Sequence, residues 1–304
     1  MPTVAFFNDQ FVPIEQAKVS VMAHAFNYGT AVFEGIRGYW NAAHEQLYVF
    51  RLHEHSERLL QSGRLLQMKI PYSASDLDGL IVELLRREGY RTNVYIRPLI
   101  YKADEIIGVR LHDLQDKLTI FAVPFGRYIE KEEGASVCVS SWRRNDDNAL
   151  PPRGKVSGGY VNSAFIKSDA QLKGFDDAIV LNQDGHVSEG SAQNLFMVRG
   201  GKLITTPITA NILEGITRAT VLELARAELG LETQEREIDR TELYVAEELF
   251  LCGTGVQIAA VTSVDYYPIG NGKIGPITQQ LRDLYFRVVN AEVDKYRGWC
   301  TPVY

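Results

Sequence analysis

The chain has 304 residues, of which 45% are hydrophobic and 23% charged, and its formal net charge at pH 7 is −6. This length and composition are typical of an ordinary globular protein with two domains or one large one. Because the balance is acidic and no run of basic residues occurs, binding to nucleic acid or to an anionic membrane is not expected.

The cysteines and the N-terminal residues indicate in which cellular compartment the protein is expected. Cys138, Cys252 and Cys300 lie far apart and form neither a paired framework nor a metal-ligand spacing. We therefore expect a reducing, cytoplasmic environment and no bound metal. Residues 1–13 have no basic start followed by a long apolar core, and no stretch approaches the roughly 20 apolar residues of a membrane span, so neither a signal peptide nor a membrane anchor is expected.

The first elements alternate between hairpin and helix patterns. Residues 4–12 predict a hairpin that turns at Asn8 and Asp9, and residues 24–37 are rich in aromatic residues and glycine. A helix is predicted over 53–68.

The helix at 53–68 carries Arg58. A second helix is predicted to begin near Ser75, whose side chain would cap it with Asp78 three residues on, and to end at Gly89.

The next segment, NVYIRPLIY, predicts a strand with an arginine between apolar neighbours. Strand alternation places Tyr95, Arg97, Leu99 and Tyr101 on one face. Arg97 has two interpretations that the sequence leaves open. It could be an edge-strand arginine in an ion pair, or an anchor whose planar fork matches a carboxylate.

The pattern changes after the strand predicted at 118–126. Residues 126–135 are rich in charge and glycine and predict a linker between a small α/β domain, 1–125, and a large domain, 136–304. For the large domain we predict, in chain order, a strand at 137–142, a helix at 159–173, two strands around a turn at 182–185, a hairpin with Gly200 and Gly201 at its tip, a helix at 215–230, two strands with a glycine-rich turn within 248–264, and a helix at 276–296. This mixture favours an α/β fold of mixed α+β type over a regular parallel sheet.

Lys155 and Glu189 stand out chemically. Lys155 lies among Gly154, Ser157, Gly158 and Gly159, where the backbone can approach a flat ligand. A buried lysine amine becomes a nucleophile toward carbonyls, and a carboxylate can keep a heterocyclic nitrogen protonated. Those are the requirements of pyridoxal-phosphate chemistry, although a glycine-flanked lysine is more often a solvated loop residue.

Two turns could hold a phosphate. In EGITR the first free N–H groups of a helix would belong to Ile216 and Thr217, and helix N-termini bind anions. In CGTGVQ, Thr254 lies between two glycines in a turn that can form a nest of N–H groups. A simple helix cap explains the first pattern equally well.

The order of these motifs resembles a known signature. The run from Glu189 to Phe196, then Leu203-x-Thr205, then Gly215-Ile216-Thr217-Arg218, is similar to that of the class IV aminotransferases, the pyridoxal-phosphate enzymes of fold type IV. The runs 28–37 and 95–98 resemble the branched-chain amino acid aminotransferases within that class. The resemblance covers nearly the whole chain and implies two domains, with the active site at the domain and subunit interface.

The resemblance implies roles in holding pyridoxal 5′-phosphate. Lys155 would hold the cofactor as a Schiff base and move the proton at the substrate α-carbon. Glu189 would pair with the pyridine nitrogen, and Tyr160 would bond the phenolic oxygen of the ring. The phosphate would be held by Arg58, Ile216, Thr217 and Thr254.

The resemblance also implies a substrate pocket. Phe33, Tyr28 and Tyr128 would line it, while Tyr95, Arg97 and the backbone of Thr254-Gly255 would meet carboxylates, with Arg37 assisting. Val109, in a loop with Gly108, would enter the site of a neighbouring subunit, which implies a homodimer at least. Taken alone, Phe33 and Tyr28 read as core aromatics and Arg37 as a surface arginine.

The implied reaction is transamination of branched-chain L-amino acids with 2-oxoglutarate. The alternatives are a D-amino acid aminotransferase, an R-selective amine transaminase, an aminodeoxychorismate lyase, or a non-catalytic protein of this fold. Two departures touch the pocket. Phe125 stands where some relatives have tryptophan, and the turn Gly-Thr-Gly-Val-Gln, which includes Gly255 and Gln257, stands where many have alanines and a glutamate.

Overall fold

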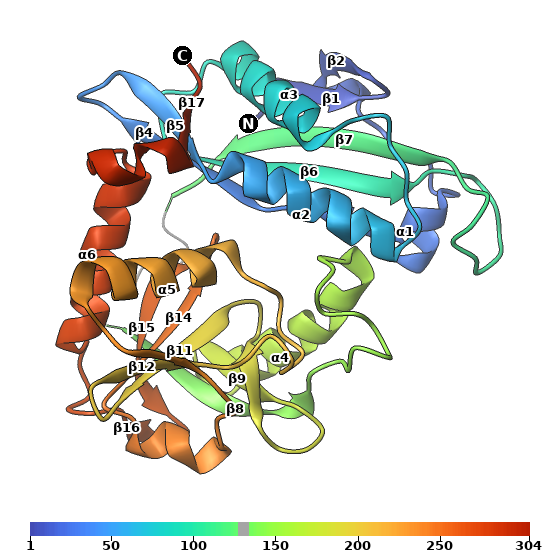
Figure 1. Ribbon diagram of the computed structural model, residues 1–304. Helices are drawn as coiled ribbons and strands as arrows, with labels where there is room; N and C mark the ends of the chain where they lie inside the picture. Colours follow the sequence, from blue (N-terminus) through green and yellow to red (C-terminus); the bar gives the residue numbers. More distant parts are fainter. Residues whose placement is uncertain (127–133) are drawn as a thin grey trace. The chain divides into compact units, whose positions relative to one another are not determined.

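The computed structural model describes residues 1–126 and 134–304 (Figure 1). These residues form two compact units. The first consists of Met1–Gly126, Gly154–Gly158 and Arg287–Tyr304, and the second of 134–153 and Gly159–Phe286. The expected mixed α/β class is confirmed, since each unit is built on a sheet accompanied by helices. The domain limits expected from the sequence, with a linker at 126–135, stay a prediction, and most of that linker lies outside the described residues.

The sheet of the first unit is antiparallel throughout its described part. Its strand order is β17-β5-β4-β6-β7-β1-β2, and β3 pairs with β6. The strands are β1 (Val4–Phe7), β2 (Gln10–Pro13), β3 (Ala31–Phe33), β4 (Ile36–Asn41), β5 (Gln46–Phe50), β6 (Val94–Lys102), β7 (Asp116–Pro124) and β17 (Cys300–Pro302).

The hairpin predicted at 4–12 is confirmed as β1 and β2. Asn8 and Asp9 both have positive φ, 49° and 62°, which the tight turn between twisted strands requires and which these two residue types tolerate.

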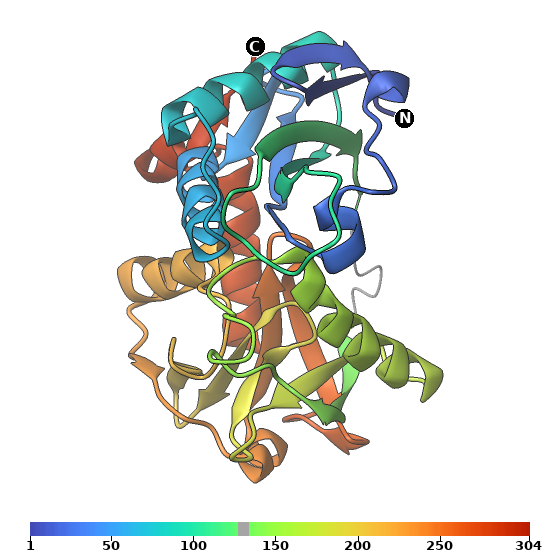
Figure 2. The same cartoon turned by 90° about the vertical axis from the view of Figure 1, so that its right-hand side faces the viewer.

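Two helices cover one face of this sheet (Figures 1 and 2). They are α2 (Leu52–Leu65) and α3 (Ala74–Glu88), and the short α1 (His24–Tyr28) precedes β3. In α3 the buried residues recur at helical spacing, as Leu77, Ile81, Leu84 and Leu85. Gly89 ends α3 in the left-handed conformation, as predicted.

The predicted cap of α3 is wrong by two residues. Ser73, not Ser75, caps the helix. Its hydroxyl oxygen accepts from the Asp76 N–H, and the Asp76 carboxylate accepts from the Ser73 N–H. Both serines have an aspartate three residues on. Asp78 is instead engaged by α2, because the Ser56 hydroxyl donates to it at 2.6 Å.

The second unit has a mixed sheet. In its described part the order is β10-β9-β8-β15-β14-β11-β12-β13, with β16 beside β15, and β8 is parallel to both β9 and β15. The strands are β8 (Ala135–Arg143), β9 (Asp177–Leu181), β10 (Val187–Gly190), β11 (Asn194–Arg199), β12 (Lys202–Thr205), β13 (Thr233–Glu235), β14 (Glu248–Gly253), β15 (Gln257–Val264) and β16 (Tyr267–Pro268).

The helices of the second unit begin where site residues are expected. Tyr160 starts α4 (Tyr160–Leu172), and Ile216 starts α5 (Ile216–Leu229). The strands predicted around 182–185 and the hairpin with Gly200 and Gly201 are confirmed.

The helix predicted at 276–296 is too long. The observed α6 (Pro276–Val289) stops before Ala291, whose φ is +58°, and a 3₁₀ turn, Asp294–Trp299, leads into β17. A left-handed alanine cannot continue a right-handed helix, and the apolar spacing beyond it belongs to the turn. Among the described residues, no helix is long and apolar enough to cross a bilayer.

Candidate active site

Lys155 is fixed by its backbone within the first unit. Its N–H donates to the Ser62 hydroxyl on α2 at 3.1 Å, and its carbonyl accepts from the Phe33 N–H at 3.0 Å. Its amine lies 5.0 Å from the centre of the Phe33 ring. The main chain at this half-buried lysine is therefore held beside β3, with the amine near the Phe33 ring.

Gly29, which follows α1, and Gly158, which follows Lys155, allow their two segments to lie close together. The Gly158 N–H donates to the Gly29 carbonyl at 3.1 Å. A Cβ on Gly29, whose φ is +68°, would stand 2.8 Å from the Gly158 Cα. A side chain at Gly29 would therefore push the Lys155 segment away from β3.

Arg58 is held by a buried carboxylate that sequence reasoning did not single out. Glu34 is fully buried, and its two oxygens accept from Arg58 Nε at 2.7 Å and Arg58 Nη2 at 2.8 Å. His55 Nδ1 lies 2.7 Å from the same carboxylate. His55 and Arg58 share a face of α2, being three residues apart. The available signal was the place of Glu34 inside the run 28–37.

The electrostatics of this cluster favour a charged Glu34. Burial alone would raise the pKa of Glu34, but the positive charge of Arg58 and the hydrogen bonds from Arg58 and His55 hold it well below its ordinary value. Burial lowers the pKa of His55, with the charges of Arg58 and Lys155 acting in the same direction and Glu34 opposing them. The carboxylate thus fixes one edge of the Arg58 guanidinium.

Tyr95 and Arg97 lie on the same face of β6, as alternation predicted. Arg97 Nη2 donates to the Tyr95 hydroxyl at 2.9 Å, and its guanidinium stands 4.2 Å from the Phe33 ring centre. Since β6 lies between β4 and β7, the edge-strand interpretation of Arg97 is wrong. Gly35 makes room for Tyr95, because a Cβ there would be 2.1 Å from the Tyr95 hydroxyl oxygen.

Arg37 is not a surface residue. Its side chain is 2% exposed, donates to the Gly126 carbonyl at 3.0 Å and lies 4.7 Å from the Phe125 ring centre. Arg37 and Tyr95 are direct partners across β4 and β6. Phe125 therefore contacts Arg37, and its ring centre is also 5.2 Å from that of Tyr95.

Tyr28 and the segment of Val109 are joined. The Gly108 N–H donates to the Tyr28 hydroxyl at 3.2 Å, and Val109, next in the chain, is exposed. Tyr128, expected in the same pocket, lies outside the described residues.

In the second unit, Glu189 on β10 is buried, and Arg144 and Asn194 are among its partners. Arg144 pairs with its Oε1 at 2.5 Å, and Asn194 Nδ2 donates to its Oε2 at 2.9 Å. Arg144 is held in turn by the Asn211 carbonyl at 3.3 Å. Sequence reasoning did not assign Arg144, which follows a strand and carries no local motif. Asn194 was part of the quoted signature but was given no role.

Asn194 also links Glu189 to the start of α5. Its side chain donates to the Leu213 carbonyl at 2.9 Å, and a Cβ on Gly215 would be 2.0 Å from its Oδ1. Gly215 thus lets the first turn of α5, with the N–H groups of Ile216 and Thr217, lie against Asn194.

The turn of Thr254 and Gly255 is in the same unit. It joins β14 to β15, and Asn194 is the ladder partner of Cys252 just before it. Gln257, which ends the turn, is buried with a φ of +62°. The glycine-rich turn predicted between two strands is confirmed as a structure; its role stays a prediction.

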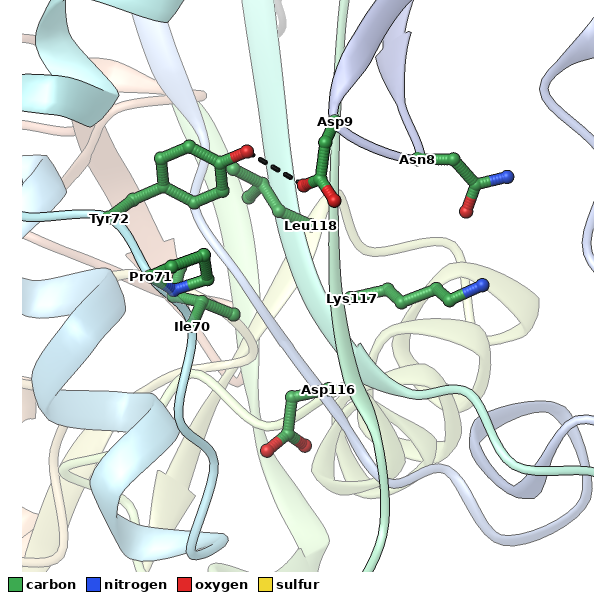
Figure 3. A pocket seen from close by; sticks show the side chains of 8 residues that line it. All are labelled: Asn8, Asp9, Ile70, Pro71, Tyr72, Asp116, Lys117 and Leu118. Atoms are coloured by element: carbon green, nitrogen blue, oxygen red, sulfur yellow. Dashed lines mark hydrogen bonds between the residues drawn. The ribbon is translucent and has the colours of Figure 1, made fainter.

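One cavity of the first unit is lined by none of the site residues discussed above. This cavity, of about 200 Å³ (Figure 3), is lined by Asn8, Asp9, Ile70, Pro71, Tyr72, Asp116, Lys117 and Leu118. Within it the Tyr72 hydroxyl donates to Asp9 at 2.7 Å, and burial, aided by this bond, raises the pKa of Tyr72 to about 12. In the described part of the chain, no three His, Cys, Asp or Glu side chains are arranged to hold a metal ion.

Comparison with known proteins identifies the family. The family model described as amino-transferase class IV matches residues 31–264. The chain belongs to this family. A probable branched-chain-amino-acid aminotransferase of Aquifex aeolicus is 48% identical over 99% of this chain and 96% of its own length. The branched-chain-amino-acid aminotransferase of Escherichia coli K12 is 38% identical over 98% of this chain and 96% of its own length.

Solved structures of class IV aminotransferases are also similar to the chain. A branched-chain aminotransferase from Thermoproteus uzoniensis with norvaline has a TM-score of 0.96, 41% identity and full coverage of both chains. The PLP-form of such an enzyme from Thermobaculum terrenum has a TM-score of 0.95 and 42% identity, covering 100% of this chain and 99% of that one. The fold expected from the motif order is therefore confirmed.

Proposed function

We propose that this class IV aminotransferase transfers the amino group of branched-chain L-amino acids to 2-oxoglutarate with pyridoxal 5′-phosphate. The relatives named for this activity match nearly the full chain. One observation carries the proposal. The Phe33 ring has the Lys155 amine 5.0 Å from its centre and the Arg97 guanidinium 4.2 Å from it. The Phe33 ring thus has a lysine amine and an arginine beside it. This combination suits an amino acid, because the arginine can bind its carboxylate and the ring can contact an apolar side chain.

The described residues fit this cofactor by their chemistry. The chemistry of the residues matches that of the cofactor: a lysine amine for the aldehyde, a buried carboxylate for the ring nitrogen, and an arginine and a helix N-terminus for the phosphate. When bound, pyridoxal phosphate supplies an electrophilic carbonyl carbon and a ring that accepts electrons.

Each residue has a defined task in the proposal. The Lys155 amine holds the aldehyde and later carries the proton at the substrate α-carbon. Glu189, with its charge compensated by Arg144, holds a proton on the ring nitrogen, and Tyr160 donates to the phenolic oxygen. Arg58 binds the phosphate, because Glu34 fixes its guanidinium. The N–H groups of Ile216 and Thr217 and the Thr254 hydroxyl complete the phosphate site.

The substrate carboxylates are assigned to the first unit and to the Thr254 turn. Arg97 and the Tyr95 hydroxyl bind a carboxylate, with the Gly255 N–H and Arg37 in support. Phe33, Tyr28 and Tyr128 cover the branched side chain. The second carboxylate of 2-oxoglutarate requires one of these cations to reach the far end of the pocket.

A homodimer is part of the proposal. The backbone of the segment around Gly108 is held in place, yet Ile107 and Val109 are 78% and 86% exposed. Exposed apolar side chains on an anchored backbone suit insertion into a second copy of the chain.

Amino donors separate this function from its alternatives. The holoenzyme is mixed in separate cuvettes with L-leucine, D-alanine and R-phenylethylamine, and the conversion of the visible cofactor band is followed. We expect conversion with L-leucine alone. Conversion with D-alanine or the amine, and none with L-leucine, would assign the protein to another activity of its class. A protein that stays colourless after addition of the cofactor would not be an enzyme of this kind.

A further inference from the structure

The connection between β6 and β7, residues Ala103–Gln115, has neither helix nor strand of its own. Its base is closed by the Ala103 N–H, which donates to the Gln115 carbonyl at 2.9 Å. A long connection of this kind within a compact unit is usually either functional or disordered, and the contacts of its backbone distinguish the two. What holds its far end therefore decides how well it can recognise a ligand.

His24, the first residue of α1, holds the far end. Its side chain is completely buried, and its Nε2 lies 2.9 Å from the Gly108 carbonyl oxygen. Its Nδ1 lies 2.7 Å from the Thr30 hydroxyl. A carbonyl oxygen can only accept, so Nε2 carries the proton and, in the neutral ring, Nδ1 accepts from Thr30. The Thr30 hydroxyl thus fixes the tautomer that binds Gly108.

The same helix engages the other backbone group of Gly108. The Gly108 N–H donates to the Tyr28 hydroxyl, and the His24 and Tyr28 rings are 4.7 Å apart between centres. The backbone N–H of His24 also donates to the Asp104 carbonyl at 2.8 Å. Both polar groups of Gly108 are therefore held by α1, and Val109 follows directly from a fixed point.

We propose that His24 is a positioning residue, which holds Tyr28 and Gly108-Val109 together as one recognition element for the side chain of the amino donor. This inference rests on the proposed function for the identity of the donor. It applies whether the element meets a substrate bound by its own subunit or by a second copy. His24 itself touches no substrate in this scheme.

The first test measures the segment directly in the holoenzyme without substrate. His24→Asn keeps a polar partner for Thr30 but is too short to reach Gly108, whereas His24→Gln can still donate to the Gly108 carbonyl. We expect amide hydrogen exchange of residues 104–112 to accelerate about five- to tenfold in His24→Asn, as for one lost buried hydrogen bond, and to be partly restored in His24→Gln. His44→Asn, an exposed histidine in the same unit, is the matched control.

The second test uses steady-state kinetics of the same holoenzymes. For His24→Asn we expect the KM for L-leucine to rise about five- to tenfold, with kcat within about twofold and the affinity for pyridoxal phosphate unchanged. A variant that is merely less stable would lose kcat or cofactor instead. Unchanged exchange and unchanged KM in His24→Asn would overturn the proposal.

A third variant guards against misfolding. Thr30→Val keeps the imidazole but removes the hydroxyl that fixes its tautomer, so we expect smaller changes in the same direction. If His24→Asn does not fold, unchanged exchange and KM in Thr30→Val overturn the proposal. If the wild-type enzyme does not use L-leucine, the proposed function fails, while the exchange experiment still decides whether His24 holds the segment.

Discussion

At the residue scale, the charged side chains of Arg58 and Glu189 are each held by an oppositely charged partner. Arg58 is oriented by Glu34, and Glu189 by Arg144 and Asn194. Buried charges are tolerated only when they are paired and hydrogen-bonded, so each pair fixes a direction as well as a charge. The consequences differ for binding and for stability.

Replacement of Glu34 by glutamine is expected to weaken cofactor binding. The amide cannot accept both Arg58 bonds and presents a donor to another donor, so the guanidinium loses its orientation. We expect the Kd of the apoenzyme for pyridoxal phosphate to rise about tenfold or more, measured by spectrophotometric titration. Glu83→Gln, which removes an exposed pair with Arg87, is the control. An unchanged Kd would contradict the role of Glu34.

Glu34 also predicts a pH dependence of stability. Its pKa in the folded protein lies below the ordinary value of 4.5. Its contribution is therefore fully present above about pH 4.5 and is lost as the pH falls through the folded-state pKa. We expect the difference in unfolding free energy between the wild type and Glu34→Gln, from urea titrations, to be constant between about pH 6 and 7 and to shrink below about pH 4.5. A constant difference down to acid pH would be inconsistent with a charged Glu34.

Arg144 is expected to matter more for stability than a neighbouring surface arginine. Arg144→Met removes the Arg144 ion pair of the buried Glu189, which should cost about 3–5 kcal/mol of unfolding free energy. Arg153→Met removes only exposed pairs with Asp147 and Glu214 and should cost no more than about 1 kcal/mol. Equal losses in denaturant titrations would show that burial of the pair is unimportant.

At the scale of elements, local patterns were predicted well and exact ends less well. The hairpin at 4–12, the stop at Gly89 and the helix after Gly215 follow from turn and cap chemistry within a few residues. The start of α3 and the end of α6 were misplaced. In the first case two equivalent capping patterns compete, and packing of Asp78 against α2 decides between them.

The cap of α3 provides a matched pair of variants. Ser73→Ala removes the side-chain bond to the Asp76 N–H and should lower the unfolding free energy by about 1 kcal/mol. Ser75→Ala, in the first turn of the same helix, should change it by a few tenths of a kcal/mol at most. A larger loss in Ser75→Ala than in Ser73→Ala, in thermal or urea unfolding, would indicate that Ser75 caps the helix.

The partners of the site residues could not be read from local patterns. Glu34 and Arg58 meet because β3 and α2 pack together, and Arg144 and Glu189 because β8 and β10 both pair with β9. The motif order singled out the residues to which the proposal gives roles, whereas the side chains that hold them depend on tertiary contacts that no spacing encodes.

At the scale of the whole molecule, the proposed function requires the Lys155 amine for activity, whereas the fold should not depend on that side chain. Lys155→Ala should abolish transamination while circular dichroism and the unfolding midpoint stay close to those of the wild type. Retained turnover would refute its assigned role.

The proposed homodimer can be tested by mixing two inactive proteins. If Val109 serves the site of a second subunit, a heterodimer of Lys155→Ala and Val109→Glu has one site with an intact lysine and an intact partner segment. Activity should therefore appear when the two variants are unfolded and refolded together. No recovery, with dimers formed as judged by sedimentation, would indicate that Val109 serves its own subunit.

Because β17 lies at the end of the chain, its pairing with β5 can form only when synthesis is nearly complete. This strand pairs with β5, although almost the whole chain separates them in sequence. While the ribosome is still making the intervening residues, β5 carries a row of unsatisfied backbone groups that can recruit another nascent chain. Polysomes translating this message are therefore where aggregation should begin, and slowing elongation between β5 and β17 should increase the need for chaperones.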